Sequence, residues 1–420
     1  MKKTRFRTGA AAVGLVLLFT VGCSGDGDGD GGGDAVRIEV DKVVALADES
    51  VRIEVTGLDA GQEVTVTSRA TDHAGTSWSG RAAFAADEAG AVDLTRARPR
   101  SGTYEKADGM GLFWSMNAQK APADEAWFYA TWPEDRRAYE VHLAVEVDGK
   151  QVAAERLTRT WMSKGVVHRP LTAAKDGVVG TLYQPAPGAP RRPPVLSFGG
   201  SEGGPGDKHA AALLASRGHP VLALCYFGCP ERPENLERIE LEYFADAARL
   251  LHREAGAGAQ RPSVIGNSRG SEAAQLLAHH HPDLVRDVVL YAPSRDTNPG
   301  IPDPKVPAWT KDGEPIELKP IPLDRVRGTV LAIGGGKDGL WPAGPSTTAI
   351  GEQRGASGQQ HRALLYPDAG HGVGTYPHTA AGLRNKHHLT GQDVDMGGTR
   401  AAAQQARSDS WPQVLELLQD

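Results

Sequence analysis

Alternating apolar and polar residues dominate the chain between residues 35 and 162. The run Val36–Val40 alternates apolar with charged side chains, and Tyr139–Thr158 has the pattern of a hairpin that turns at an Asp-Gly pair. Short runs of this kind are separated by Gly and Pro, and no long helical period interrupts them. The pattern predicts an all-β, antiparallel sandwich over residues 35–162.

Tryptophan is concentrated in this first region. Aromatic rings at this density are typical of a sandwich core, and the sequence around them shows no titratable cluster that would indicate a ligand platform. We therefore interpret these residues as core. Five of the eight Trp of the chain belong to the set: Trp78, Trp114, Trp127, Trp132 and Trp161.

From residue 163 onward, strand-like and helix-like segments alternate. Such alternation predicts a mainly parallel sheet that is covered by helices on both faces, so we assign residues 163–420 to one α/β domain. Eight prolines between residues 293 and 322 predict an irregular lid over one end of the sheet. The expected elements are a hairpin of Val166–Pro170 and Val178–Tyr183, strands Pro194–Phe198, Pro220–Tyr226, Ser263–Gly266, Val285–Tyr291, Thr329–Gly334 and Ala363–Tyr366, and helices Lys208–Arg217, Leu236–Glu254, Ser271–His280 and Thr399–Gln419.

The N-terminus has the features of an export signal. Four basic residues precede the apolar run Ala10–Phe19, and Gly22-Cys23 follows it. This arrangement resembles the lipobox of bacterial lipoproteins, in which the cysteine is lipidated. We expect residues 1–23 to be a signal peptide, Cys23 to carry the lipid, and residues 24–34 to tether the protein to the outer face of the cell membrane. Plain secretion is the alternative.

Composition narrows the class of protein. Lys and Arg number 46 against 52 Asp and Glu, the net charge is −6, and no basic stripe is present, so nucleic acid is excluded as a partner. With 40% hydrophobic and 23% charged residues, the chain is typical of a folded globular protein. Besides Cys23, only Cys225 and Cys229 are present, and we favour a small buried hydrophobe at Cys225 over a disulfide between the two.

The most informative motif is Gly266-Asn267-Ser268-Arg269-Gly270. It has the form G-x-S-x-G and lies directly between a predicted strand and a predicted helix. Glycines at both ends permit the sharp turn that presents a serine hydroxyl above a sheet. The motif predicts that Ser268 is a catalytic nucleophile.

A serine nucleophile needs a base, and the base needs an orienting acid, in the chain order serine, acid, histidine. Two predicted strands after the motif end in Lys337-Asp338 and in Asp368-Ala369-Gly370-His371. We assign His371 as the general base and Asp338 as the orienting carboxylate. Asp296 and Asp368 are the rival acids.

The oxyanion that forms during acyl transfer needs hydrogen-bond donors. One should be the backbone N–H of Arg269, beside the nucleophile. The other should come from the glycine-rich loop 199–204, where either Ser201 or Glu202 is the expected donor. This loop lacks the Gly-Lys-Ser/Thr ending of a phosphate loop, and we expect no metal ion or cofactor.

These motifs together resemble a known family, the acyl-CoA thioesterases and bile acid-CoA:amino acid N-acyltransferases. The resemblance implies an immunoglobulin-like sandwich followed by a dienelactone-hydrolase-like α/β-hydrolase domain, and a triad of Ser268, Asp338 and His371. It covers nearly the whole chain after the tether. The segments that carry it are 108–116 (DGMGLFWSM), 223–227 (ALCYF), the motif around Ser268, 337–341 (KDGLW), 366–371 (YPDAGH) and 397–400 (GGTR).

The nucleophile decides between the activities found in that family. The aminoacyl-transferring members carry Cys, whereas Ser268 matches the hydrolysing members. The expected function is therefore a serine hydrolase of acyl thioesters or carboxylic esters. An N-acyltransferase, or a non-catalytic surface protein on the same scaffold, is the alternative. Acyl-CoA is cytosolic, so the predicted export leaves open whether CoA is the acyl carrier.

Overall fold

The structure, a computed structural model, describes residues 35–419. The predicted signal peptide, the tether and the lipidation site Cys23 all lie outside the described residues. Within the described part, no helix combines the length and apolarity needed to cross a membrane.

The first region is built mainly of strands in two sheets. A three-stranded sheet has the order β1-β3-β6, and a larger sheet has the path β2-β10-β9-β4-β5-β7, with β8 on β5. Alternate residues of β3, β4, β5 and β9 are buried, as the period of two predicts. The elements are β1 (Arg37–Val40), β2 (Val44–Leu46), β3 (Ile53–Thr56), β4 (Glu63–Thr71), β5 (Ser77–Ala85), β6 (Val92–Asp93), β7 (Ser101–Gly102), α1 (Gly111–Trp114), β8 (Asn117–Ala118), η1 (Ala123–Glu125), β9 (Ala138–Val147) and β10 (Lys150–Thr160).

The hairpin β9–β10 confirms one expectation, and two others need correction. Its turn residues Asp148 and Gly149 both have positive φ, as a tight Asp-Gly turn requires. The pairing is not purely antiparallel, because β2 runs parallel to the end of β10. Nor is the region purely β, because Gly111–Trp114 forms the buried helical turn α1. Gly111 lies against the Tyr104 ring, where a Cβ would come within 2.3 Å of it, so this turn needs glycine.

An eight-stranded sheet forms the second region, in the order β11-β12-β14-β13-β16-β17-β20-β21. The strands from β14 to β21 are parallel, and β11 and β12 are antiparallel at one edge, which confirms the predicted hairpin. This is the arrangement of an α/β-hydrolase sheet. The strands are β11 (Val167–Leu171), β12 (Val179–Gln184), β13 (Val195–Phe198), β14 (Val221–Cys225), β16 (Ser263–Asn267), β17 (Val288–Tyr291), β20 (Val330–Gly335) and β21 (Arg362–Tyr366).

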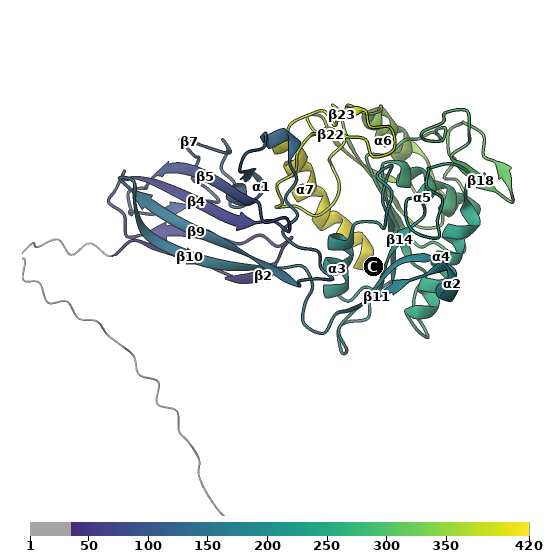
Figure 1. Ribbon diagram of the computed structural model, residues 1–420, viewed down its shortest axis with the longest axis horizontal. Helices are drawn as coiled ribbons and strands as arrows, with labels where there is room; N and C mark the ends of the chain where they lie inside the picture. Colours follow the sequence, from purple (N-terminus) through teal and green to yellow (C-terminus); the bar gives the residue numbers. More distant parts are fainter. Residues whose placement is uncertain (1–34, 420) are drawn as a thin grey trace, which may run out of the picture.

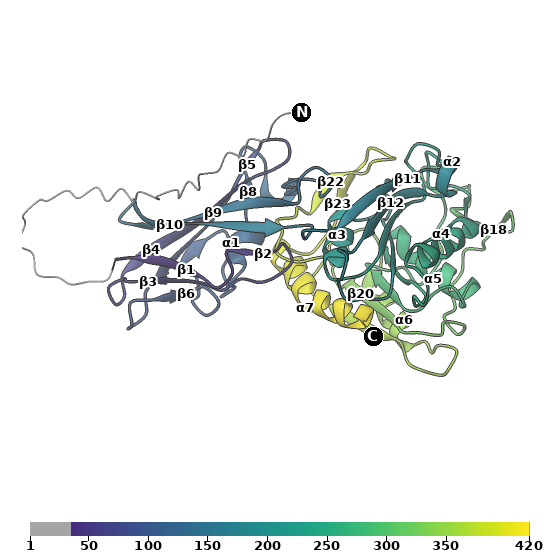
Figure 2. The ribbon, with the colours of Figure 1, turned by 90° about the horizontal axis from the view of Figure 1, so that it is seen from below.

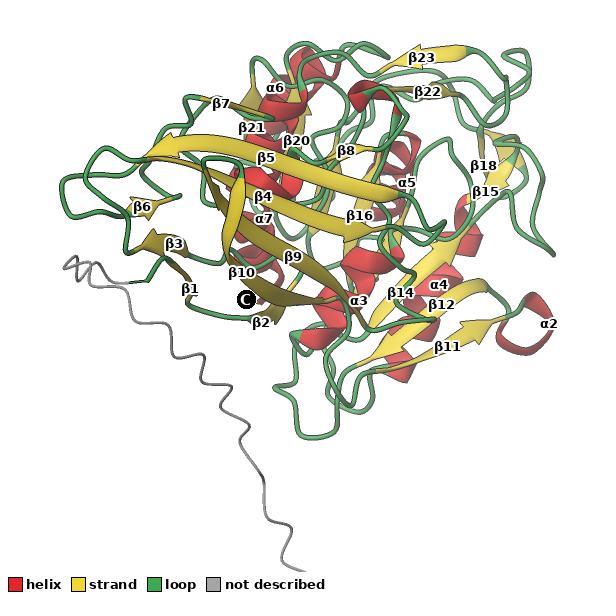
Figure 3. Cartoon of the chain, turned by 60° about the vertical axis from the view of Figure 1, so that its left-hand side comes forward, coloured by secondary structure: helices red, strands yellow, loops and turns green. Residues whose placement is uncertain are grey.

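Helices cover both faces of this sheet, as predicted (Figure 3). Along β20, Leu331 and Ile333 pack with α3 and α7, whereas Val330 and Ala332 point to the opposite face with α4 and α5. Strands buried on both sides account for the continuous apolar runs in the sequence. The helices are α2 (Ala173–Asp176), α3 (Lys208–Ser216), α4 (Leu241–Glu254), α5 (Arg269–His280), α6 (Ala343–Glu352) and α7 (Arg400–Gln419).

One predicted helix starts later than expected. The prediction Leu236–Glu254 is wrong at its beginning, because α4 starts at Leu241. The preceding residues pair as β15 (Ile239–Glu240) with β18 (Trp309–Lys311), which itself pairs with β19 (Glu314–Pro315). Two of these strands belong to the predicted lid, so the lid is partly regular and is held by this small sheet. The remaining pair is β22 (Arg384–Lys386) with β23 (Asp393–Asp395).

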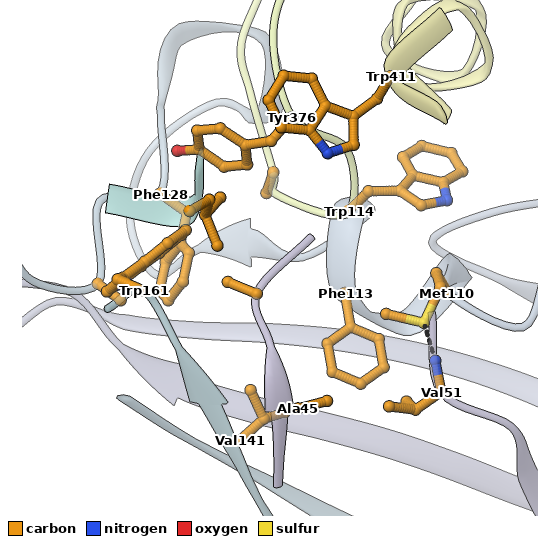
Figure 4. Close-up of a cluster of buried hydrophobic side chains, with 14 of the residues drawn as sticks. Ala45, Val51, Met110, Phe113, Trp114, Phe128, Val141, Trp161, Tyr376 and Trp411 are labelled. Carbon is orange, nitrogen blue, oxygen red and sulfur yellow. Dashed lines mark hydrogen bonds between the residues drawn. The ribbon is translucent and has the colours of Figure 1, made fainter. Parts of the chain in front are cut away.

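A shared hydrophobic core joins the two regions. Helix α7 runs along the junction between them in both views of the ribbon (Figures 1 and 2). Trp411 of α7 and Tyr376 belong to the same buried cluster as Phe128 and Trp161 of the first region (Figure 4). The Trp411 indole N–H donates to Asp48, and Asp48 also accepts a hydrogen bond from Arg217. The regions therefore pack against each other through a shared apolar cluster and hydrogen bonds.

The structure corrects the interpretation of the two cysteines. Cys225 and Cys229 form a disulfide with a Cα–Cα distance of 6.5 Å. Cys225 is fully buried, as expected, but it is not a free thiol. The loop after β14 brings Cys229 back onto the strand end, a path that the sequence spacing did not indicate.

Candidate active site

The segment around Ser268 forms the expected sharp turn between β16 and α5. Ser268 has φ 53° and ψ −121°, a strained conformation for a residue with a side chain. A Cβ on Gly266 would lie 2.3 Å from the carbonyl oxygen of Gly270, and one on Gly270 would lie 2.2 Å from that of Gly199. Both glycines are thus required by close backbone approach, as the motif predicted.

His371 and Asp338 meet above the ends of β21 and β20. The distance from His371 Nδ1 to Asp338 Oδ2 is 2.7 Å, and the Asp338 side chain is 1% exposed. The other carboxylate oxygen accepts the N–H groups of Leu340 and Trp341 at 2.8 and 3.3 Å. The Trp341 ring lies edge-on to His371, with centroids 5.7 Å apart. The carboxylate is therefore fixed on both oxygens and directs Nδ1 of the imidazole, which leaves Nε2 free.

The rival acids are held elsewhere. Asp368 forms an exposed ion pair with Lys337 at 2.7 Å, and Asp296 pairs with its neighbour Arg295 at 3.2 Å. Neither forms a hydrogen bond or an ion pair with His371 in the described structure. The hydroxyl of Ser268 has no hydrogen-bond partner among residues 35–419, which is common in unliganded hydrolases because the contact to the base tightens when substrate binds.

The glycine-rich loop lies directly over the serine. A Cβ on Gly200 would be 2.7 Å from the Ser268 Cβ, so only glycine fits. The Tyr226 hydroxyl donates to the carbonyls of Gly199 and Gly200 at 3.1 and 3.0 Å and so fixes the loop. Sequence analysis did not select Tyr226, although it lies in the ALCYF segment that carried the family resemblance.

The side chain of Glu202 occupies the backbone N–H of the same residue, which sequence analysis had offered as an oxyanion donor. Much of the residue is exposed, but its carboxylate turns inward and accepts the Gly200 N–H at 2.8 Å. Burial of this carboxyl group raises its pKa, while hydrogen bonds from the Glu202 and Gly200 N–H groups and the nearby His371 oppose the shift. The N–H groups of residues 200 and 202 are therefore occupied. Those of Ser201 and Arg269 have no acceptor among residues 35–419.

A buried ion pair follows the serine on α5. Arg269 Nε lies 3.1 Å from Glu272 Oε1, and Glu272 also accepts from the Trp309 indole and from Asn298 at 2.8 and 3.0 Å. Burial raises the pKa of Glu272, and Arg269 opposes this shift. Trp309 and Asn298 belong to the predicted lid. The ion pair thus ties the lid to the turn that carries Ser268.

A cavity of about 820 Å³ opens beside His371 and is lined by both regions of the chain. The first region contributes an aromatic segment that includes Trp127, Tyr129 and Trp132. The interpretation of all five tryptophans as core is therefore wrong for Trp127 and Trp132. Trp132 is 37% exposed and stacks on Tyr129 at 5.5 Å. The period of two did not reveal this segment because residues 126–132 form no strand.

Two family models match this chain. The model described as the acyl-CoA thioester hydrolase/BAAT N-terminal region matches residues 48–173, and the BAAT/acyl-CoA thioester hydrolase C-terminal model matches residues 310–420. The chain belongs to this family. Its second match contains Asp338 and His371, and Ser268 lies between the two matches.

Curated relatives align with most of the chain. Acyl-coenzyme A thioesterase 6 of Mus musculus is 27% identical over 410 residues, which cover 89% of this chain and 93% of the mouse protein. Acyl-coenzyme A thioesterase 1 of Homo sapiens is 27% identical, in an alignment that covers 87% of this chain and 92% of the human protein. Acyl-coenzyme A amino acid N-acyltransferase 1 of Mus musculus is 26% identical and covers 89% of this chain and 94% of its own. The family thus includes hydrolases and a transferase.

Proposed function

We propose that this chain is a serine hydrolase that cleaves acyl thioesters through an acyl-enzyme on Ser268. The observation that carries the proposal is the strained Ser268 at the end of β16 together with a buried His371–Asp338 pair at the ends of β21 and β20, three parallel strands of one sheet. This arrangement supplies a nucleophile, a base and an orienting acid at the same edge of the sheet. The carboxylic esters expected from sequence are the second substrate class for the same chemistry.

The reaction has two halves, acylation and deacylation of Ser268, and His371 acts as base and then as acid in each half. His371 Nε2 takes the Ser268 hydroxyl proton while Oγ attacks the carbonyl carbon, and Asp338 stabilises the imidazolium. When the C–S bond breaks, His371 returns that proton to the leaving thiolate. Water then attacks the acyl-enzyme, His371 accepts its proton, and the acid leaves as Ser268 is reprotonated.

The oxyanion donors that we propose are the backbone N–H groups of Arg269 and Ser201. Both are unoccupied in the described chain, whereas the Glu202 N–H is directed to its own carboxylate. Of the two residues left open by sequence, Ser201 is therefore the better donor. These N–H groups would stabilise the negative charge on the carbonyl oxygen in the transition state.

A fluorophosphonate probe and a substrate panel test this function. The probe should label Ser268 and no other residue, and labelling should block hydrolysis of acyl-CoA and p-nitrophenyl esters. If the probe labelled a different residue and activity were lost, that residue and not Ser268 would be the nucleophile. The same panel reports the preferred leaving group.

Hydrolysis should outweigh transfer to an amine. Similarity to an N-acyltransferase makes transfer the second candidate, and the serine nucleophile favours water as the acceptor. With glycine or taurine present, product analysis should give mainly free acid. If the product were mainly the N-acyl amide, the protein would be an N-acyltransferase and not a hydrolase.

We further propose the finer features that sequence suggested: an immunoglobulin-like sandwich up to residue 162, a dienelactone-hydrolase-like domain from residue 163, and a lipid anchor at Cys23 on the outer face of the membrane. Support for the anchor is the N-terminal sequence alone. The protein should fractionate with membranes, and Cys23→Ser should release it or leave an unprocessed precursor. Wild-type protein in the cytosol with Met1 intact would exclude export.

A further inference from the structure

Helix α7 presents a guanidinium to the cavity beside His371. Ala403, Arg407 and Trp411 all line this cavity, and their spacing of four places them on one face of the helix. Arg407 is only 7% exposed, so its charge lies deep in the protein. Nothing in the proposed chemistry at Ser268 uses this residue.

The charge of Arg407 has no partner within the described chain. Its one hydrogen bond there runs from Nε to the Ala403 carbonyl at 3.4 Å, and no carboxylate of residues 35–419 forms an ion pair with it. Its terminal nitrogens are not sealed from the cavity. Buried arginines are normally paired, because an uncompensated buried charge is costly.

Other arginines that are largely buried have ion pairs or hydrogen bonds to neighbouring segments; Arg159, at 1% exposure, donates to the carbonyls of Ala47 and Glu49. Arg269 pairs with Glu272 at 3.1 Å, and Arg217 pairs with Asp48 at 3.1 Å. Arg400, seven residues before Arg407 on the same helix, donates to Asn117 and to two backbone carbonyls. Arg407 differs from these residues because its one hydrogen bond is to its own helix and because it lines the cavity.

The surroundings of Arg407 are suited to an anion. Tyr129 and Tyr376 line the same cavity, lie close enough to interact electrostatically with Arg407, and have no hydrogen-bond partner for their hydroxyls among residues 35–419. Burial lowers the pKa of Arg407 to about 10, so the group is a cation at neutral pH. The other cation near it is Arg400, and the nearby His378 is neutral because burial lowers its pKa to about 3.

Two acidic residues of the cavity, Glu202 and Asp207, have hydrogen-bond partners of their own, and both also interact electrostatically with Tyr129. Glu202 interacts with His371 and with Asp207, and Asp207 accepts from Thr375 and caps α3. Apolar side chains that include Phe128, Leu383 and Trp411 complete the lining. The cavity therefore joins a reactive end, an apolar wall and a cationic site.

We propose that the cavity binds an acyl group whose far end carries a carboxylate, held by Arg407 and by the hydroxyls of Tyr129 and Tyr376. This inference rests on the proposed function and names its substrate class: the half-thioester, or half-ester, of a dicarboxylic acid. A planar carboxylate can accept two hydrogen bonds from a guanidinium, and the two phenols add donors beside it.

A matched pair of thioesters tests the proposal. Suberyl and octanoyl N-acetylcysteamine thioesters have the same chain length, differ in the terminal carboxylate, and carry no phosphate on the leaving group. Wild-type enzyme should show a kcat/KM about 10- to 100-fold higher for the suberyl compound. The series from succinyl to sebacyl should show one preferred length.

Variants of Arg407 should remove this preference. Arg407→Met keeps the bulk of the side chain and should bring the suberyl/octanoyl ratio to unity or below, while Arg407→Lys should retain part of it. Tyr376→Phe should reduce the ratio by about 3- to 10-fold. The matched control is Arg400→Lys, which should leave the ratio unchanged because Arg400 does not line the cavity. Thermal unfolding identifies any variant that fails to fold.

Three outcomes would overturn the inference. Wild type that prefers octanoyl, with Ser268 still labelled by fluorophosphonate, would remove the carboxylate site and leave the hydrolase intact. A preference for the suberyl thioester that survives in Arg407→Met would also exclude Arg407 as the carboxylate site. Equal kcat/KM for the two N-acetylcysteamine thioesters, with a fall in kcat/KM for octanoyl-CoA but not for octanoyl N-acetylcysteamine in Arg407→Met, would assign Arg407 to a phosphate of the leaving group.

A binding measurement decides the matter if neither thioester is hydrolysed. Calorimetry with the Ser268→Ala protein should give tighter binding of free suberate than of octanoate, and Arg407→Met in that background should abolish the difference. Equal binding of the two acids would overturn the carboxylate site independently of any turnover.

Discussion

The two regions of this protein contribute to one cavity in different ways. The α/β region supplies the proposed reactive groups from short loops at the ends of parallel strands, with Ser268 after β16, Asp338 after β20 and His371 after β21. The β region supplies a wall from a segment without regular structure, which includes Trp127, Tyr129 and Trp132. Reactive groups need exact mutual geometry, which a sheet provides, whereas a wall needs only shape and apolar surface.

This difference between the regions predicts which substitutions should change kcat and which should change KM. Substitutions at the strand ends should lower kcat, because they act on the transition state. Substitutions in the aromatic segment should raise KM, because they act on contacts that substrate and transition state share. The junction between the regions should govern stability, since its core is common to both.

The largest effect is expected at Ser268. Ser268→Ala should lower kcat by about 10⁴-fold or more, because no other group can form the acyl-enzyme. The free energy of unfolding should stay within about 1 kcal/mol of wild type, since the hydroxyl has no hydrogen-bond partner in the described chain. Ser271→Ala, three residues along α5, is the matched control and should retain activity. Comparable turnover in both variants would place the nucleophile elsewhere.

Asp338→Asn should lower kcat by about 10⁴-fold. The backbone N–H groups of Leu340 and Trp341 would hold the amide oxygen, so the NH₂ group would face His371 Nδ1. The imidazole would then carry its proton on Nε2 and could not accept one from Ser268. Steady-state kinetics of this variant and of Asp296→Asn distinguishes the two candidate acids. A large fall in kcat in the Asp296 variant alone would show that Asp296 is the orienting acid.

The junction should become less stable in acid because of His378. Its Nε2 lies 3.1 Å from the Ser50 hydroxyl, and its Nδ1 accepts an N–H of Gln404 at 3.2 Å, so the neutral ring fits. Burial lowers the folded-state pKa to about 3 from an ordinary 6.5. Between these values the unfolded chain binds more protons, so stability rises with pH and falls on acidification, by at most about 1.4 kcal/mol per pH unit.

Urea unfolding at a series of pH values measures this slope. In His378→Gln the slope between about pH 6.5 and pH 4 should be smaller by close to one proton than in wild type. His168→Gln, at a partly exposed position in β11, is the control and should change the slope little. Identical slopes in wild type and in His378→Gln would mean that this ring does not carry the acid sensitivity of the junction.

The smallest effect is expected in the aromatic wall. Trp132→Ala should raise KM for long acyl thioesters by about 3- to 10-fold and leave kcat nearly unchanged, because it removes apolar contact area and none of the proposed reactive groups. Val152→Ala, an exposed residue of β10, is the control and should change neither constant. A loss confined to kcat would show that the β region acts on the reactive groups after all.

Much of the fold could be predicted because its signals are local. The Asp-Gly turn between β9 and β10, the doubly buried strands and the turn at Ser268 each follow from a few adjacent residues. The start of α4 could not be predicted, since Ile239 pairs with Trp309 far along the chain. The disulfide was missed for a related reason: its geometry depends on the path of the loop between the cysteines.

The sequence by itself led to the assignment of the proposed reactive groups. The motif around Ser268 needs glycine at both ends for steric reasons that act within five residues, and the order serine, acid, histidine follows from the order of strands in the sheet. Sequence analysis also chose Asp338 over Asp368, and the structure has Asp338 hydrogen-bonded to His371 and Asp368 in an ion pair with Lys337.

Only the tertiary structure decided what surrounds those groups. Sequence analysis interpreted Trp132 as a core residue and did not select Arg407, whereas the packing of α7 against both regions places the two residues in one cavity. Whether a side chain is paired, and whether it faces a void, depends on contacts between segments hundreds of residues apart. The periodicity of a single segment carries no information about such contacts.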